Sequence, residues 1–490
     1  MDKPDSMLCV IPSRLAVGEP FAVKVKLLGP VHPIPSTSWN WSPHESVSGS
    51  PFNLNVARKI QFMDNCLPEW CGELQVEGQG LEGPARIEFD GKNQGVFTGD
   101  VRPIRVVPGF RWTRPGFHFV RLIDPVSGTE ALSNPVCVTE DRPRQRLYWG
   151  DPHWQSFFSD GIRIPEQLYA FARDEGFLDF GALSDHMEAV TDRQWEYYQA
   201  VTNDFNQPGV FVTLHGQEWT HHTTANGAPG HRNIYYRGNG GPVLRSSDPD
   251  CNTLDKLWRK LDAMQGIESI AIPHHPANVV MGVKWELGWN PKYEKAVEIH
   301  SVWGSSERHA EDGNPLPIRH CRGEMRGRHV IDALKRGYRL GFVGGGDIHD
   351  GRPGDDLHSE SYPPEHDSLQ PEGFTAAWAP ELTRENIFDA MTSRRTYATT
   401  KTRLYLEAVP EKAESSANMQ LRAASEEGLL DAVLVRNGED AATVAPQSDP
   451  RVIETSLPCD ALGPEEFAYV RVTTKKGHMA WSSPVWGGEV

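Results

Sequence analysis

The sequence has no long hydrophobic run, few cysteines and a shortage of positive charge. No apolar segment approaches the roughly 20 residues of a membrane-spanning helix, so we expect no membrane partner. The seven cysteines are an odd number without zinc-type pairing, which indicates reduced thiols. The N-terminus lacks a basic region followed by an apolar segment, so no secretory signal is visible and the expected location is the cytoplasm.

Negative charge dominates, because 66 acidic residues exceed 49 lysines and arginines and the formal net charge is -17. Such a surface repels phosphate backbones, so we expect a small-molecule substrate and no nucleic-acid partner. A small anionic substrate would need local compensation from arginines or metal ions. Nothing in the sequence indicates an oligomeric state.

The composition changes twice along the 490 residues. Residues 1–140 carry short β-type runs between Pro- and Gly-rich turns, a pattern typical of an antiparallel sandwich. After a polar linker at 139–144, residues 147–400 alternate apolar strands with helical segments, which is α/β patterning. From 402 to 490 the β-type runs return. We therefore predict an α/β domain flanked by an N-terminal and a small C-terminal β domain.

The α/β segment has recognisable starts and stops. Pro165 opens a helix that ends at Gly176, and an apolar β-prone run follows it. Strands are predicted at 147–149, 177–183, 210–214, 267–272, 296–299 and 340–343. Helices are predicted at 165–176, 192–204, 253–264, 328–336 and 383–394.

The stretch 150–161 is the first sign of a metal site. It places His153, Gln155 and Asp160 at the end of a β-prone run that begins at Leu147. Positions two apart in a strand share a face, so His153 and Gln155 can reach one ion together. By itself the stretch is equally compatible with a surface loop that contains one histidine.

Further predicted strands end in side chains of the same kind. In a parallel α/β barrel the C-terminal strand ends converge on one face, so groups at these ends would meet. One histidine at a strand end is usually a hydrogen-bonded structural residue, but five such endings favour a site. The five endings are Asp185 with His186, His215 with Glu218, His274 with His275, Glu298 with His300, and Asp347 with His349.

The residue types suit two or more metal ions. Imidazoles alongside carboxylates favour zinc, manganese or iron, whereas an oxygen-only set would favour magnesium or calcium. A carboxylate can bridge ions about 3.5–4 Å apart, and a bridging water then loses a proton near neutral pH. The sequence lacks a Gly-x-Ser-x-Gly nucleophile elbow, so a metal-bridging hydroxide is the simplest nucleophile.

The order of these motifs resembles the PHP superfamily, named for polymerase and histidinol phosphatase domains. The resemblance covers residues 147–350 and rests on His153-Trp154-Gln155, Ser159-Asp160-Gly161, Ser184-Asp185-His186, Gly216-Gln217-Glu218, Pro273-His274-His275-Pro276 and Gly346-Asp347-Ile348-His349. The stretches that follow, to Thr400, look like a PHP-related family of largely uncharacterised function. The resemblance implies a distorted (β/α)7 barrel, a trinuclear metal site and hydrolysis of phosphoesters.

The resemblance also implies how the ligands divide among the ions. Glu218 is the hub, because it would bridge the first two ions. His275 competes with His274 for the second ion. The remaining assignments are His153, Gln155 and Asp347 for the first ion, His231 and His274 for the second, and Asp160, His186 and His349 for the third.

One residue departs from the superfamily pattern, which usually has histidine where this chain has Gln155. A glutamine carbonyl oxygen binds hard cations but holds zinc-type ions more weakly than imidazole does. The first ion is then weakly held or a harder metal, and a binuclear site is the alternative. We therefore expect two or three divalent ions of zinc, manganese or iron as cofactors.

Four residues are predicted to take part in catalysis. Glu218 is the first, through the ions it bridges. His215 is a candidate proton donor to the leaving group, with support of a ligand as its alternative. Arg232 and Arg352 could neutralise a phosphoryl group, and for each the alternative is a structural salt bridge.

These observations lead to the hypothesis of a metal-dependent hydrolase, a phosphoesterase by family resemblance. The ligands alone would serve the hydrolysis of amides, lactones or carboxylic esters equally well. A rival hypothesis is a catalytically degenerate protein whose β domains bind a carbohydrate or a partner chain. Gln155 is the feature in favour of the rival, and the remaining ligands count against it.

Overall fold

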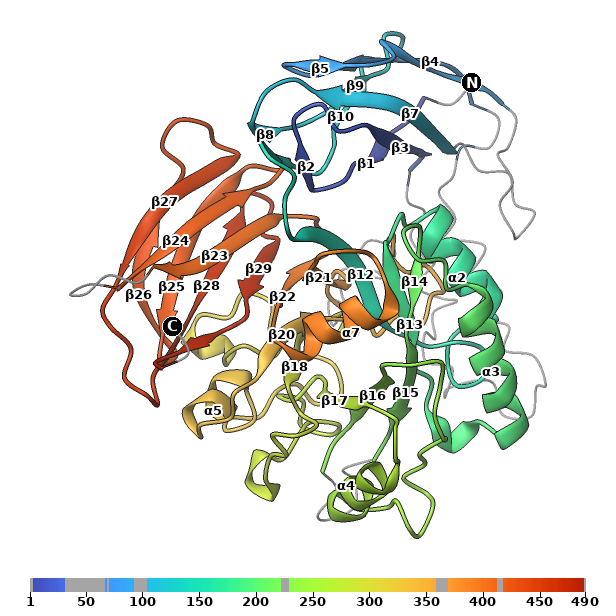
Figure 1. Cartoon of the computed structure of the whole chain (residues 1–490), viewed down its shortest axis with the longest axis vertical. Helices are drawn as coiled ribbons and strands as arrows, with labels where there is room; N and C mark the ends of the chain where they lie inside the picture. Colours follow the sequence, from blue (N-terminus) through green and yellow to red (C-terminus); the bar gives the residue numbers. More distant parts are fainter. Residues whose placement is uncertain are drawn as a thin grey trace.

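The computed structural model describes residues 3–30, 67, 70–91, 104–221, 229–357, 369–411 and 417–488. Strands predominate in this part of the chain, and five α-helices accompany them. The strands near the N-terminus lie at the top of Figure 1, and below them the last strands lie on the left and the middle of the chain on the right.

The N-terminal strands form three small sheets, ordered β1-β3-β7-β5, β10-β9-β4-β6 and β2-β11-β8. In β3, Phe21, Val23 and Val25 alternate with less buried positions and enter the core beside Phe110. The strands are β1 Ser6–Val10, β2 Arg14–Ala16, β3 Phe21–Leu28, β4 Cys71–Glu77, β5 Leu81–Glu82, β6 Arg86–Asp90, β7 Ile104–Trp112, β8 Gly116–His118, β9 Arg121–Ile123, β10 Glu130–Leu132 and β11 Val136–Thr139.

The longest sheet begins in the middle of the chain and continues into its C-terminal part. Its order is β14-β13-β12-β21-β22-β29-β28-β25-β26, with β30 paired to β28. The pairing of β22 with β29 joins the two parts, and the predicted domain limits stay a prediction. The strands are β12 Arg146–Trp154, β13 Phe180–Leu183, β14 Val212–Thr213, β21 Gly373–Ala379, β22 Thr396–Thr400, β25 Leu429–Arg436, β26 Glu439–Val444, β28 Phe467–Thr474, β29 Met479–Ser482 and β30 Val485–Trp486.

Three further sheets are short, with orders β15-β16-β17, β19-β18-β20 and β23-β24-β27. The strand β17 lies beside β18, β13 beside β15, and β20 beside β21 and β22, so strand ends from several sheets come together. The strands are β15 His215–Trp219, β16 Arg232–Tyr236, β17 Ser269–Pro273, β18 Ala296–Ser301, β19 Gly304–Ser305, β20 Gly341–Gly344, β23 Tyr405–Glu411, β24 Ala417–Ala424 and β27 Val452–Cys459.

The regular (β/α)7 alternation is met only in part among the described strands. Parallel pairing, as expected, joins β12 to β13, β13 to β14, and β18 to β20. However, β16 runs antiparallel to both β15 and β17, and β21 runs antiparallel to β12. No strand was predicted at β16 from the sequence, although Ile234, Tyr235 and Tyr236 favour extended structure.

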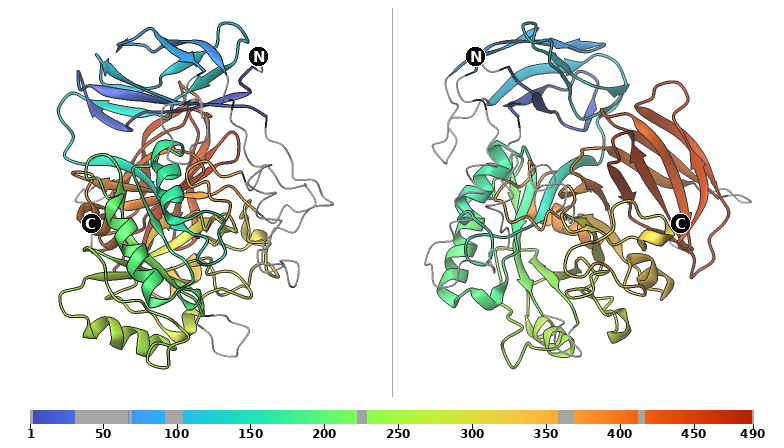
Figure 2. Two further views of the ribbon diagram at one scale, coloured as in Figure 1. Left: turned by 90° about the vertical axis from the view of Figure 1, so that its right-hand side faces the viewer. Right: turned by 180° about the vertical axis from the view of Figure 1, so that it is seen from behind.

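The helices begin at the positions that their capping residues indicate. Pro165 occupies the first turn of α2, and Thr191 with Gln194 forms a capping box for α3. The helix α2 packs on α3 and β13, and α7 packs on β21 (Figure 2). None of the described helices is long and apolar enough to cross a membrane. The helices are α2 Pro165–Asp174, α3 Asp192–Asp204, α4 Leu254–Ala263, α5 Val330–Lys335 and α7 Arg384–Thr392, with 3-10 turns η3 Met187–Ala189, η4 Trp285–Leu287 and η5 Ala310–Asp312.

Candidate metal centre

The predicted ligands form one linked group at the ends of strands. His153 lies near the end of β12, Glu218 in β15 and His274 directly after β17, and all three are 0% exposed. The others lie in adjoining segments: Gln155 and Asp160 after β12, His186 before η3, His231 before β16, and Asp347 with His349 after β20.

Glu218 is the centre of this group. Its Oε1 lies 2.8 Å from His231 Nδ1, 3.2 Å from His274 Nε2 and 3.3 Å from His186 Nδ1. Its Oε2 lies 3.6 Å from His153 Nε2. Burial alone would raise the pKa of Glu218, but the facing His186 and His274 bring it well below its usual value. The carboxylate is therefore held as an anion among four imidazoles.

Within the described residues, two sets of three side chains have the geometry to hold a metal ion, namely His231, His274 and His275, and His153, His274 and Asp347. The donor atoms within each set lie within 4.8 Å of one another. His274 belongs to both sets. His275 and Asp347 have φ angles of 32° and 50°, a region that non-glycine residues rarely adopt, and such strain concentrates at functional sites.

Buried ring nitrogens test whether a metal fits. Among the described residues, Nδ1 and Nε2 of His274 make no hydrogen bond, although Nε2 lies 3.2 Å from the Glu218 carboxylate. Nε2 of His153 likewise makes none, at 3.2 Å from Asp347 Oδ1. Buried polar atoms left without a hydrogen bond are costly, and a cation that takes their lone pairs removes that cost. The residues present therefore fit a metal ion with imidazole and carboxylate ligands.

The side chains expected at a third ion also lie together. His349 Nε2 is 3.3 Å from Asp160 Oδ1, and His186 Nε2 is 3.6 Å from Asp160 Oδ2. His349 Nδ1 contacts the backbone oxygen of Asp347, which directs Nε2 toward Asp160. Burial raises the pKa of Asp160, but His349 and His186 bring it well below its usual value.

A buried carboxylate outside the ligand group fixes the backbone beneath it. Asp151 Oδ1 accepts hydrogen bonds from the backbone N–H groups of His153 and Gly346. A Cβ on Gly346 would lie 2.3 Å from Asp151 Oδ2, so only glycine permits this approach. Asp151 was not predicted, although its position two residues before His153 in the same strand was the available signal.

Glu298 in β18 orients one of the ligands. Its Oε2 lies 2.9 Å from His153 Nδ1, which donates to the carboxylate and leaves Nε2 directed at Asp347 and Glu218. We expect Glu298→Ala to weaken metal affinity about 10- to 100-fold, because the ring loses its orientation and its basicity. Competition with a chromophoric chelator measures this change. Glu286→Ala, at an exposed position in η4, is the control, and equal affinities of the two variants would contradict the role of Glu298.

Gln155 turns its amide nitrogen, which cannot bind a metal, toward the group. Nε2 donates to Glu218 Oε2 at 2.9 Å, and Oε1 accepts from Ser159 Oγ at 2.8 Å. Ser159 Oγ also lies 2.6 Å from Asp185 Oδ1, although one hydroxyl has a single hydrogen to donate. A ligand role for Gln155 requires the amide turned by about 180°, and Ser159 could then accept from Nε2 while donating to Asp185.

His215 faces away from the ligand group. It is three residues from Glu218 in β15, so the two side chains lie on opposite faces of the strand. Its Nε2 lies 2.9 Å from Asn203 Oδ1, and burial together with the charge of Arg384 lowers its pKa to about 3. These contacts favour a structural role over proton donation to a leaving group.

The two predicted catalytic arginines are engaged in ion pairs. Arg232 Nε donates to Glu294 Oε1 at 3.0 Å, and Arg352 Nη2 donates to Asp355 Oδ2 at 2.7 Å. Both guanidinium groups are buried. Each arginine thus makes the ion pair that its structural alternative predicts.

The comparisons with known proteins identify relatives without an assigned function. The model of a family described as "Protein of unknown function (DUF3604)" matches residues 164–310 and 333–433. An uncharacterised protein of Chlamydia pneumoniae is 27% identical over 414 residues, which cover 78% of this chain and 63% of the relative. An uncharacterised protein of Chlamydia muridarum is 27% identical over 413 residues with the same coverage. The chain thus spans under two thirds of the length of these curated relatives.

One solved structure is described as a two-domain protein containing a predicted PHP-like metal-dependent phosphoesterase from Bacteroides vulgatus. It is 17% identical, with a TM-score of 0.34, and the match covers 68% of this chain and 88% of that one. The two segments that the family model matches together cover more than half of the sequence. This protein therefore belongs to the DUF3604 family of proteins of unknown function.

Proposed function

We propose that this protein is a PHP-like metal-dependent hydrolase that cleaves phosphoesters of small substrates. The proposal includes a PHP-type barrel within residues 147–400 and β domains at 1–140 and 402–490. It places two or three divalent ions at the group around Glu218. The ligands would be His153, Asp160, His186, Glu218, His231, His274, Asp347 and His349, with Gln155 as a weak additional ligand and His275 as the alternative to His274.

One observation carries the proposal, namely that Glu218 is buried among four imidazoles whose nitrogens lie 2.8 to 3.6 Å from its oxygens. Burying this many nitrogen and carboxylate atoms away from water is energetically costly unless cations bind to them. Nitrogen and carboxylate donors together favour zinc, manganese or iron.

The side chains around the ligands would keep the site in one arrangement. Glu298 holds the ring of His153, and the indole N–H of Trp303 donates to Asp347 Oδ2. Bound ions supply Lewis-acid activation of water and neutralise charge on phosphoryl oxygens. The burial of Glu218 and His153 excludes bulk water and strengthens every electrostatic interaction there.

A substrate panel tests the reaction type. The protein is assayed with p-nitrophenyl phosphate, bis(p-nitrophenyl) phosphate and p-nitrophenyl acetate, each with manganese, zinc or ferrous iron. We expect metal-dependent hydrolysis of at least one phosphoester. Cleavage of the acetate alone would assign the site to carboxylic esters. No turnover by a protein that also binds no metal would favour the degenerate binding protein.

A further inference from the structure

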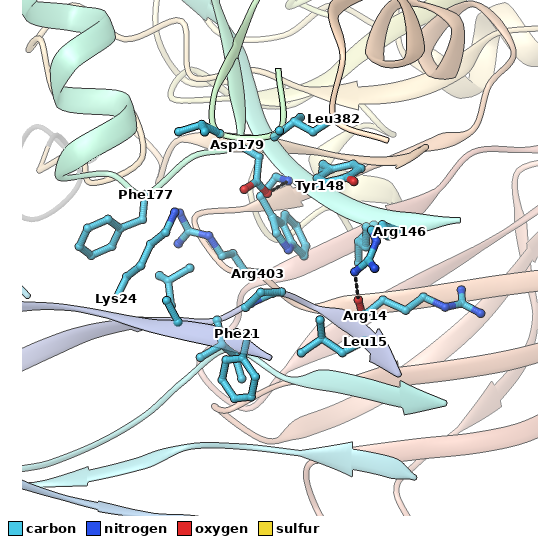
Figure 3. A pocket seen from close by; sticks show the side chains of 18 of the residues that line it. Arg14, Leu15, Phe21, Lys24, Arg146, Tyr148, Phe177, Asp179, Leu382 and Arg403 are labelled. Carbon is cyan, nitrogen blue, oxygen red and sulfur yellow. Dashed lines mark hydrogen bonds between the residues drawn. The ribbon is translucent and has the colours of Figure 1, made fainter. Parts of the chain in front are cut away.

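A cavity lies between the N-terminal sheets and the middle of the chain, apart from the candidate metal centre. It has a volume of about 460 Å³ and is bounded by β2 and β3 on one side and by β12 and the segment just before β13 on the other (Figure 3). Tyr148 lines it, whereas His153 lies five residues further along the same strand, about 16 Å away. The volume is in the range of small-molecule sites.

Two cations converge on one part of this cavity. Figure 3 shows Lys24 reaching up from β3 and Arg403 approaching from the other side, next to Asp179 and Phe177. Among the described residues the Lys24 ammonium has no hydrogen-bond or ion-pair partner, and it lies 5.8 Å from the centre of the Phe177 ring. Arg403 is 5% exposed; its Nη2 donates to the Gly176 carbonyl at 2.6 Å, its guanidinium lies over the Phe374 ring, and its buried Nε makes no hydrogen bond within the described structure.

Carboxylates act on both of these side chains, and Asp179 acts on each most strongly. Burial lowers the pKa of Lys24, the carboxylate of Asp179 opposes that change, and Arg403 adds to it. Burial also lowers the pKa of Arg403, again opposed first by Asp179. The cavity's other two arginines are already paired, Arg14 with Glu407 and Arg146 with Glu19. Glu372, Glu426 and Asp355 act on Arg403 as well, and Asp174 acts on Lys24. Lys24 is nevertheless without an ion-pair partner among the described residues, so it can accept one negative charge.

The rest of the lining is largely apolar. Leu15 and Phe21 come from the N-terminal strands and Ile11 from the segment after β1, and Trp149 and Leu382 lie on the opposite side. The Trp149 indole already donates to Ser13, so these side chains offer surface rather than hydrogen bonds. A ligand that fits would have one negative charge and a hydrocarbon body.

We propose that this cavity binds a small monocarboxylate with an apolar body. Lys24 and Arg403 contact the carboxylate, and Arg403 uses the N–H groups that its hydrogen bond to the Gly176 carbonyl leaves available. Phe21 and Phe177 pack against the hydrocarbon. Asp179 and the other nearby carboxylates disfavour a dianion such as a phosphomonoester, because their negative charge repels it more strongly than a monoanion. The bound ligand would thus contact both Lys24 in β3 and Arg403 in the segment that follows β22.

Octanoate is the probe, with octanamide as its neutral analogue and octyl phosphate as a dianion, each titrated calorimetrically into the full chain. We expect one octanoate per chain, and octanoate affinity at least about tenfold weaker in Lys24→Met, since hydrogen bonds to charged groups are worth that much. Lys24→Arg should restore most of the affinity. Arg111→Met, an exposed cation in β7, should bind as the wild type does.

The Glu218→Gln background separates this cavity from the metal centre, where a carboxylate could also bind. The loss caused by Lys24→Met should persist there, and octanamide should bind more weakly than octanoate to the unsubstituted chain. Equal octanoate affinity in Lys24→Met and wild type, or no saturable binding, would overturn the proposal. Tighter binding of octyl phosphate than of octanoate would overturn the choice of a monocarboxylate.

Discussion

Glu218→Gln is expected to lower kcat/KM on a hydrolysed phosphoester by at least about 10³-fold, which corresponds to roughly 4 kcal/mol. The glutamine has the same size but lacks the negative charge that four imidazoles now face. A neutral amide cannot bridge two cations, and one of its two heavy atoms is a nitrogen that does not ligate them. Steady-state kinetics with the best substrate of the panel measures the loss.

The control for this substitution is Glu196→Gln on the exposed face of α3, which should leave kcat/KM unchanged. Circular dichroism of both variants establishes that each is folded. A Glu218→Gln protein that keeps its full metal content and its full rate would show that Glu218 does not bridge the ions.

Lys26→Met is expected to reduce the free energy of unfolding by about 3–5 kcal/mol. Lys26 lies in β3 and is 0% exposed, with Nζ at 3.1 Å from Glu175 Oε2 and 2.9 Å from Asp355 Oδ2. Methionine fills the space but leaves these buried carboxylates without that cation. Urea unfolding measures the change, and Arg111→Met should shift stability by under about 0.5 kcal/mol.

The same substitution should alter the dependence of stability on pH. Burial raises the pKa of Asp355, but the charges of Lys26 and Arg352 bring it down to about 2. A carboxyl whose folded pKa is depressed stabilises fully above its unfolded value of about 3.9, and this stabilisation is lost as the pH falls toward 2. The stability difference between wild type and Lys26→Met should therefore narrow below about pH 4. A difference that stays constant between pH 5 and 2 would contradict the ion-pair account.

The sequence predicts much of the middle segment because its signals are local. Pro165, Thr191 and Thr383 sit at the starts of helices that the structure contains, and apolar runs mark β13, β17 and β20. The antiparallel β16 was missed because its short β-type run lies between motifs and carries no sign of its pairing partners. Topology of that kind depends on contacts distant in sequence.

The strand endings predicted that these side chains lie together, but not which way each single side chain faces. His215 and Arg232 each neighbour a candidate ligand in sequence, and strand alternation places them on the other face, where Asn203 and Glu294 bind them. Arg352 follows the last motif, and only the fold brings its guanidinium to Asp355.

Lys24 and Lys26 show a second limit of the sequence. Both alternate with the apolar residues of β3 and so lie on the face away from the N-terminal core, which normally faces solvent. The structure covers that face with the middle of the chain, so Lys26 becomes part of a buried ion-pair network and Lys24 lines a cavity. Nothing in the local sequence indicates that this face of β3 is covered, because the residues that pack on it lie more than 100 positions away.

The most direct test of the account is elemental analysis of the full chain purified without chelators. We predict at least two transition-metal ions per chain, of zinc, manganese or iron, and loss of these ions in Glu218→Gln. A wild-type protein that holds no transition metal, even after incubation with all three, would contradict the assignment of the Glu218 group as a metal centre.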